Sequence, residues 1–318
     1  MPYRPNHPSP FGAEGIPGSF RPLIFGEALY DHFPDGSKVL GGAPFNVAWH
    51  VQGFKANPLM VTAVGSDPEG EEILKRMEGW GMATSGVQIH PSRPTGRVTA
   101  SLKDGEPRYE IEARQAYDAI SLEGLPTPQD VGRVHLLYHG SLAVREGTSR
   151  RTLEHLRQTL QTPVLLDVNL RDPWWSREVL SGHLQGTECV KMNREETELL
   201  AGLPAQSEEQ LLAAARFLRS RHEIRTLVVT LGAAGALAIG AEGVYWQQAP
   251  RLPEMTDPVG AGDAFTAVLA LGIHERWALE TTLRRATDFA SELCRVRGAT
   301  LEDPDVYTRH SGRWIDAT

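Results

Sequence analysis

Asp257-Pro258-Val259-Gly260-Ala261-Gly262-Asp263-Ala264-Phe265 is the stretch around which this chain is organised. A glycine-rich turn leads straight into an apolar helical pattern, and one carboxylate, Asp263, lies at the junction. Unpaired N–H groups at a helix start bind anions, and glycine lets a phosphate come close to the backbone. The same residues also fit an ordinary turn followed by a helix that Asp263 caps. The rest of the chain has to decide between a phosphate site and a capped helix.

Length and composition bound the size of the domain and the kinds of partner. The chain has 318 residues, of which 41% are hydrophobic and 23% charged, enough for one large domain or a domain with an appendage. A net charge of −8 disfavours nucleic acid and anionic membranes as partners. No apolar run approaches the roughly 18–20 residues that span a bilayer.

The N-terminal segment bears on the domain organisation, and the cysteines bear on the cellular compartment. The first residues are rich in Pro and Gly and lack the apolar segment of a secretory signal. We therefore expect residues 1–21 to form a flexible tail and residues 22–318 to form the folded domain. Cys189 and Cys294 are far apart, which predicts neither a disulfide framework nor a zinc site and favours a reducing cytoplasm.

Apolar runs and helical patterns alternate along most of the chain. The run from residue 22 to 31 predicts a first buried strand with Asp31 at its exit. Such alternation predicts a mostly parallel sheet covered by helices on both faces, which is a three-layer α/β/α architecture. We expect further strands at 59–64, 134–138, 164–168, 189–192 and 226–231, a hairpin at 236–247, and helices at 69–78, 148–160 and 207–220.

One segment interrupts this alternation. Val98, Ala100 and Leu102 alternate with polar residues, a turn follows at Asp104-Gly105, and alternation then resumes. This pattern predicts a two-stranded antiparallel β flap over residues 96–113, inserted into the α/β body.

Polar groups follow several of the predicted strands. Ligands of parallel sheets bind beyond the carboxyl ends of the strands, so these groups mark a binding crevice. Strand alternation would place Asp167, Asn169 and Arg171 on one face. Each group alone also fits a structural role, since an Asn caps a helix well and Arg171 could pair with Asp172. The groups are Asp167, Asn169 and Arg171, then Asn193 and Glu196, then Thr230, Gly232 and Gly235.

A family resemblance brings these observations together. Gly41-Gly42-Ala43-Pro44-Phe45-Asn46-Val47-Ala48 and the stretch from Asp257 to Phe265 resemble the two signature segments of the ribokinase-like carbohydrate kinases, the phosphofructokinase B family. Asn193-x-x-Glu196 is similar to the family's Asn-x-x-Glu motif, and Thr230-Leu231-Gly232 resembles its nucleotide strand. The likeness runs from about Phe25 to Ala299. The chain has no P-loop motif.

The resemblance implies an ATP-dependent sugar kinase with a ribokinase-like fold. It implies that Asp263 is the base towards the attacking sugar hydroxyl and that the backbone N–H groups of Gly260, Ala261 and Gly262 form an anion hole. A β lid from about residues 30–40 and 96–113 would close over the sugar. We also expect the helix start to lower the pKa of Asp263. The remaining implied roles are sugar binding by Asp31, Gly41, Gly42, Asn46, Asn169 and Arg171, nucleotide binding by Asn193, Thr230, Gly232, Gly235, Gly260 and Gly262, Mg²⁺ binding through water by Glu196, and monovalent cation binding, as of K⁺, by Asp257.

Two departures from the family pattern limit these implications. Pro258-Val259 replaces a frequent Thr-Thr pair, which weakens the implied cation site more than the implied base. Ala233-Ala234 replaces charged residues found in many relatives, so we expect no nucleotide contact from those two side chains.

The sugar is the least determined part of the prediction. The segments from Gly26 to Asp31 and from Gly41 to Asn46 look most like those of bacterial fructokinases, so fructose is the first candidate. Other candidates are 2-keto-3-deoxygluconate, ribose, a nucleoside and a phosphorylated sugar. A catalytically silent binding protein on the same fold is the alternative of another class, and dimerisation through the lids is a further expectation. Basic residues that leave an anionic substrate open are Arg97, Lys103, Arg108 and Arg114.

Overall fold

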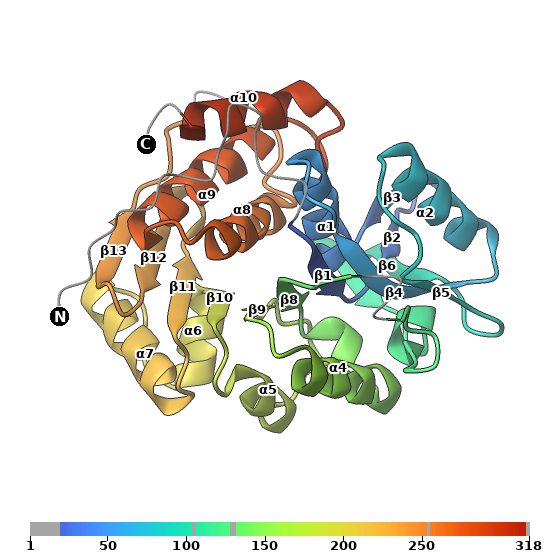
Figure 1. Cartoon of the computed structure of the whole chain (residues 1–318), viewed down its shortest axis with the longest axis horizontal. Helices are drawn as coiled ribbons and strands as arrows, with labels where there is room; N and C mark the ends of the chain where they lie inside the picture. The colour runs from blue at the N-terminus through green and yellow to red at the C-terminus, as the bar shows by residue number, and fades with distance from the viewer. Residues whose placement is uncertain (1–19, 104–105, 128–131, 253–254, 316–318) are drawn as a thin grey trace.

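A computed structural model describes residues 20–103, 106–127, 132–252 and 255–315 of the chain. A nine-stranded sheet forms its centre, and helices cover both faces of that sheet (Figure 1). The predicted α/β class with a mostly parallel sheet is confirmed. The flexible tail expected at residues 1–21 lies outside the described residues, apart from its last two positions.

The main sheet is parallel except at one edge, where β12 and β13 form an antiparallel hairpin. Its interior strands are mostly apolar because helices cover both faces; all seven residues of β4, for example, are buried. In sheet order the strands are Val244–Gln247 (β13), Ala236–Ile239 (β12), Thr226–Thr230 (β11), Cys189–Asn193 (β10), Val164–Asp167 (β9), Leu136–His139 (β8), Pro22–Phe25 (β1), Leu59–Gly65 (β4) and Val87–His90 (β5).

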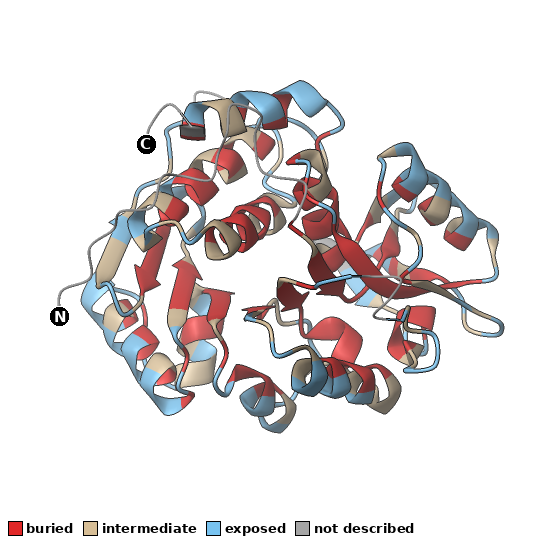
Figure 2. Ribbon diagram, in the orientation of Figure 1, coloured by how far each residue is buried: buried red, intermediate tan, exposed pale blue. Residues whose placement is uncertain are grey.

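The helices form one layer on each side of this sheet, and their buried residues face it (Figure 2). No helix within the described ranges is long and apolar enough to cross a membrane. One layer holds Ala43–Gly53 (α1), Ala261–Glu275 (α8), Leu279–Leu293 (α9) and Pro304–Ile315 (α10), and the other holds Gly147–Leu160 (α4), Arg177–Leu184 (α5), Arg194–Ala201 (α6) and Glu208–Arg221 (α7) (Figure 1). Short 3₁₀ turns lie at Ala116–Ala119 (η1), Leu142–Val144 (η2) and Gly232–Ala234 (η3).

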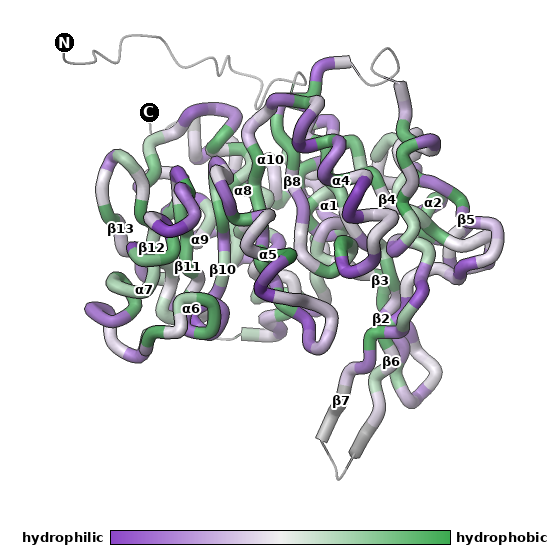
Figure 3. Tube along the Cα trace, turned by 90° about the horizontal axis from the view of Figure 1, so that it is seen from below, coloured by the Kyte–Doolittle hydropathy of each residue, from purple (hydrophilic) through white to green (hydrophobic). Residues whose placement is uncertain are grey.

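A second, four-stranded sheet projects from the body (Figure 3). Its order is β3-β2-β6-β7, and Pro68–Gly79 (α2) lies beside it (Figure 1). The antiparallel pair β6 and β7 is the flap expected at 96–113, although its predicted turn at 104–105 lies outside the described residues. The strands are Leu29–His32 (β2), Lys38–Gly41 (β3), Gly96–Lys103 (β6) and Glu106–Ile111 (β7).

The expectation of one buried strand from residue 22 to 31 is wrong. The chain leaves the main sheet after Phe25, and Asp31 belongs to β2 of the second sheet, opposite Val39 and Val98. At the break, the chain passes close to the start of α1: a Cβ added at Gly26 would lie 2.2 Å from Pro44 Cγ. Asp31 therefore lies on a strand of the second sheet rather than at the exit of β1.

Candidate active site

The two glycine-rich segments meet at Asp263. Gly260 caps the start of α8 with φ 78°, and a Cβ there would lie 2.5 Å from Ala299 Cα, so the turn requires glycine. The side chain of Asn46, in the first turn of α1, donates from Nδ2 to Asp263 Oδ2 at 2.8 Å. Asn46 Oδ1 is buried without a partner among the described residues. The packing of α1 against α8 thus brings the predicted base and a predicted sugar ligand into direct contact.

The expectation of a lowered pKa for Asp263 is wrong. Asp263 keeps some exposed surface, but desolvation by the protein around its carboxyl group raises the pKa to about 6. The Asn46 hydrogen bond and the charge of Lys191 oppose this effect without cancelling it. A carboxyl group with this pKa accepts a proton more readily than an ordinary Asp.

Not all three backbone N–H groups predicted to form an anion hole are available to an anion. The N–H of Ala261 already donates to Pro258 O at 3.2 Å. No partner is found within the described ranges for the N–H of Gly262, which lies in the first turn of α8. A Cβ added at Gly262 would lie 3.1 Å from Lys191 Nζ, so a cation faces this part of the helix start.

Lys191 is a charged residue beside the glycine-rich helix start that the sequence reasoning missed. It lies on β10 and is buried, with Nζ 2.8 Å from Asp167 Oδ2 on the neighbouring strand β9. Thr266 Oγ1 donates to the same carboxylate oxygen at 3.2 Å. Burial alone would lower the pKa of Lys191, but the charge of Asp167 raises it above the ordinary value. Lys191 is therefore a fixed cation, and its signal in the sequence was a lysine inside a buried strand.

The expected alternation of Asp167, Asn169 and Arg171 on one face is wrong. Strand β9 ends at Asp167, and Asn169 has left-handed backbone geometry with φ 39°. Asp167 is buried under Lys191, whereas Arg171 is exposed and donates to Leu170 O at 3.0 Å. Asp172 accepts from Trp175 Nε1 at 2.7 Å and forms no ion pair with Arg171 in the described part of the chain.

Arg171 nevertheless acts electrostatically on three carboxyl groups in this part of the chain. Its charge lowers the pKa values of Asp263, Glu27 and Asp31, although burial raises each of them overall. Asn169, whose carbonyl oxygen accepts from Ser141 Oγ at 3.4 Å, fixes the loop that carries Arg171.

Gly41 and Gly42 lie between the second sheet and α1. A Cβ at Gly41 would be 3.6 Å from Asp31 Oδ2, which is an ordinary contact. Gly42 caps α1 with φ 103°, and a Cβ there would lie 2.7 Å from the carbonyl oxygen of Glu27. The backbone thus requires glycine at position 42, and Gly41 lies beside the predicted sugar ligand Asp31.

Glu196 and Asn193 form a capping box at the start of α6. Glu196 Oε2 accepts from Asn193 N at 2.8 Å, and its Oε1 accepts from Leu170 N at 2.7 Å. The carboxylate therefore joins the end of β10 to the loop after β9 and keeps lone pairs for a metal-bound water. No group of three or more metal-ligating side chains gathers among the described residues.

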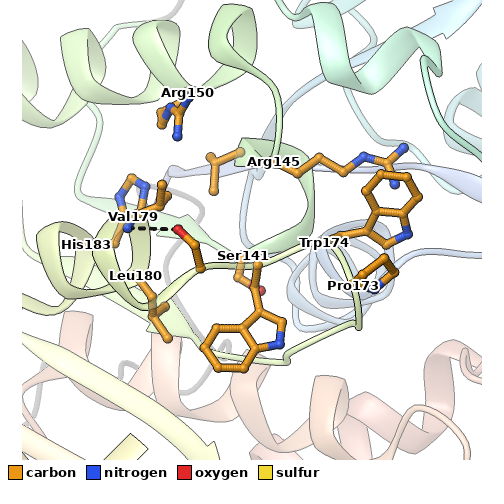
Figure 4. A pocket seen from close by; sticks show the side chains of 11 residues that line it. Ser141, Arg145, Arg150, Pro173, Trp174, Val179, Leu180 and His183 are labelled. Carbon is orange, nitrogen blue, oxygen red and sulfur yellow. Dashed lines mark hydrogen bonds between the residues drawn. The ribbon is translucent and has the colours of Figure 1, made fainter.

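A cavity of about 800 Å³ extends from the start of α8 along the ends of β10 and β11. Its size suits a nucleotide. Gly235 also has a structural role, since a Cβ there would lie 1.9 Å from Gln247 O. The hollow of about 240 Å³ in Figure 4 is a separate one, and none of the predicted nucleotide residues lines it. The predicted nucleotide residues that line the larger cavity are Asn193, Thr230, Gly232, Gly235 and Gly262.

Two expectations stay predictions. Asp257 accepts from Val259 N at 3.0 Å and from Gly298 N at 3.1 Å, which places it in the expected loop but does not test a monovalent cation. Val39 and Tyr109 are exposed on the second sheet, which leaves dimerisation through the lids untested.

A parallel sheet with a nucleotide-sized cavity and a carboxylate at a glycine-rich helix start is typical of small-molecule kinases. Residues 24–305 match the pfkB family of carbohydrate kinases, and the chain belongs to this family. The chain is 28% identical to the Escherichia coli fructokinase over 280 residues, covering 84% of this chain and 89% of the relative.

Solved structures show the same fold at lower identity. A fructokinase from Xylella fastidiosa with bound ATP superimposes with a TM-score of 0.77 and 21% identity, over 91% of this chain and 98% of the other. A fructokinase from Vibrio cholerae with fructose, ADP and calcium gives a TM-score of 0.74 and 24% identity, over 89% and 95%.

Proposed function

We propose that this sugar kinase transfers the γ-phosphate of ATP to a hydroxyl group of a small sugar, with D-fructose as the first candidate. The observation that carries the proposal is the contact of Asp263 with Asn46 beside Gly262 and the nucleotide-sized cavity. The sugar oxygen attacks the γ-phosphorus, its proton passes to Asp263, and ADP leaves. The fructokinases among the relatives support fructose without deciding it.

The other residues position the phosphates and exclude water. The N–H of Gly262 and the ammonium group of Lys191 face the charge that develops on the transferred group. Mg²⁺ would neutralise the nucleotide phosphates, with Glu196 and Asn193 holding its water shell. The second sheet closes over the sugar as a lid, which limits transfer to water.

A substrate panel tests this function. ADP formation is measured with fructose, ribose, 2-keto-3-deoxygluconate, adenosine and fructose phosphate, each with ATP and Mg²⁺. Fructose is expected to give the highest kcat/KM. ATP binding without turnover of any compound would support a silent binding protein instead.

The raised pKa of Asp263 predicts the acid limb of the pH profile. The base must be ionised to accept a proton, and burial raises its pKa to about 6. We expect kcat/KM for the sugar to fall about tenfold per pH unit below pH 6 and to level off above it. ATP affinity over the same pH range is the control. A profile that stayed flat down to about pH 4.5 would contradict the assignment.

Glu196→Gln tests the bridge between α6 and the loop after β9. The amide can accept at only one of the two N–H groups that the carboxylate now holds. We expect a lower Tm and a Mg²⁺ requirement raised about tenfold or more. Glu198→Gln, on the same helix but paired with Gln206 at the surface, is the matched control. An unchanged Mg²⁺ titration would restrict Glu196 to a structural role.

A further inference from the structure

A second large cavity lies at the end of the main sheet opposite the candidate active site. Its volume is about 910 Å³, which exceeds that of the nucleotide-sized cavity. Its lining includes Leu23 and Leu59, at the amino ends of β1 and β4, whereas Asp167 and Asn193 are at the carboxyl ends of their strands. None of the predicted sugar or nucleotide residues lines it, so the cavity is separate from both regions.

The walls of this cavity are largely apolar. Leu156 and Leu160 come from the second half of α4, Ile273 comes from the last turn of α8, and Val134 comes from the segment before β8. Because α4 and α8 belong to opposite helix layers, the cavity lies between the layers at the amino end of the sheet (Figure 1). Apolar walls around a space of this size suit a small molecule with an apolar body.

The ionisable side chains of the lining are all basic. The chain as a whole has 40 Asp and Glu residues against 32 Lys and Arg residues. None of the described residues that line this cavity is acidic. A hollow lined by charges of one sign attracts ligands of the opposite sign, so this lining favours an acidic molecule. The basic residues are Arg133, His135, His155, His274 and Arg276.

Two of these histidines are held in place by packing. The ring of His274 stacks on Phe20 with centroids 4.2 Å apart, and the ring of His135 meets His274 edge-on at 5.2 Å. His135 Nδ1 accepts from Arg21 N at 3.2 Å, which leaves the proton of the neutral ring on Nε2 as a donor. Burial lowers the pKa of both histidines. They therefore contribute polar N–H groups, and the charge of the lining comes from the arginines.

Arg133 and Arg276 are exposed, and neither forms an ion pair within the described ranges. Arg276 directly follows α8, where a cation also complements the helix dipole. Arg133 lies on the segment before β8 and follows no helix of the described chain. A helix dipole therefore does not account for both arginines, whereas a shared acidic ligand does.

We propose that this cavity is a second binding site, for a small organic acid whose apolar body packs against Leu156, Leu160 and Ile273 and whose negative charge is met by Arg133 and Arg276. The site goes beyond the proposed kinase function and does not depend on it. Its occupant would contact the end of α8, the helix whose first turn carries Asp263.

Two fluorescent probes test the site in the full-length protein. One is 8-anilinonaphthalene-1-sulfonate, which joins an apolar aromatic body to one negative charge, and the other is N-phenyl-1-naphthylamine, which has the same body without the charge. The sulfonate is expected to bind at one site per chain, about tenfold more tightly than the amine, with the same affinity whether or not ATP is present. In the double variant Arg133→Gln with Arg276→Gln, its affinity should fall about tenfold while that of the amine stays unchanged.

Arg216→Gln with Arg309→Gln is the matched control, since it removes two positive charges from exposed positions of α7 and α10. Both double variants should keep the wild-type Tm, and the control should bind the sulfonate as the wild type does. Displacement of the sulfonate by ATP, or equal sulfonate affinity in the wild type and the Arg133 and Arg276 variant, would overturn the proposal. Binding only after deletion of residues 2–19 would also overturn it, because the occupant would then be the chain's own first segment.

Discussion

Asp263→Asn is expected to fold normally and to lose at least about 10²-fold in kcat, because a positioned base contributes about 10²–10⁴-fold. The amide has the shape of the carboxylate, and its oxygen can accept the same bond from Asn46 Nδ2. It cannot take up the proton of the sugar hydroxyl. The loss should therefore lie in the chemical step rather than in substrate binding.

Three measurements separate these effects. The variant should keep the wild-type Tm and ATP affinity while kcat falls, and the pH dependence near pH 6 should disappear from its residual activity. Asp305→Asn, on the exposed start of α10, is the control for removing one negative charge. Turnover near the wild-type rate in Asp263→Asn would remove Asp263 from its role as the base.

The sequence was sufficient for the parts of the fold that depend on local patterns. The edge hairpin at 236–247 and the capping box at Ser207 were predicted correctly, since turn residues and caps act over a few positions. The apolar run from 22 to 31 was misinterpreted because apolarity shows that a strand is buried and not which sheet it joins. The second sheet becomes one sheet through the pairing of β2 with β6, far along the chain, which joins two hairpins.

The parts of the site that a sequence motif marks were predictable, whereas the parts that depend on packing were not. Asp263 and Asn46 were found from their motifs, but their direct contact depends on how α1 packs on α8. The pKa of Asp263 was predicted in the wrong direction, because the helix start is a local feature and desolvation is a property of the finished fold. Lys191 was missed for the same reason, since its partner Asp167 lies on a neighbouring strand.

Lys191→Met is the second variant with a large expected effect. Removing the cation that faces Gly262 should lower kcat by about 10²-fold or more, the usual cost of losing one charge-stabilising donor. It also leaves Asp167 as a buried carboxylate without its ion-pair partner, which is expected to cost about 3–5 kcal/mol of stability. Activity and Tm should therefore fall together in this single variant.

The double variant Lys191→Met with Asp167→Asn separates the two losses. It removes both charges of the buried pair and keeps an amide oxygen for Thr266 Oγ1, so the Tm should return close to that of the wild type. The cation facing the phosphates is still missing, and kcat should stay low. If kcat recovered along with the Tm, Lys191 would serve only to neutralise Asp167, and the charge opposite the transferred phosphoryl group would have to come from elsewhere in the site.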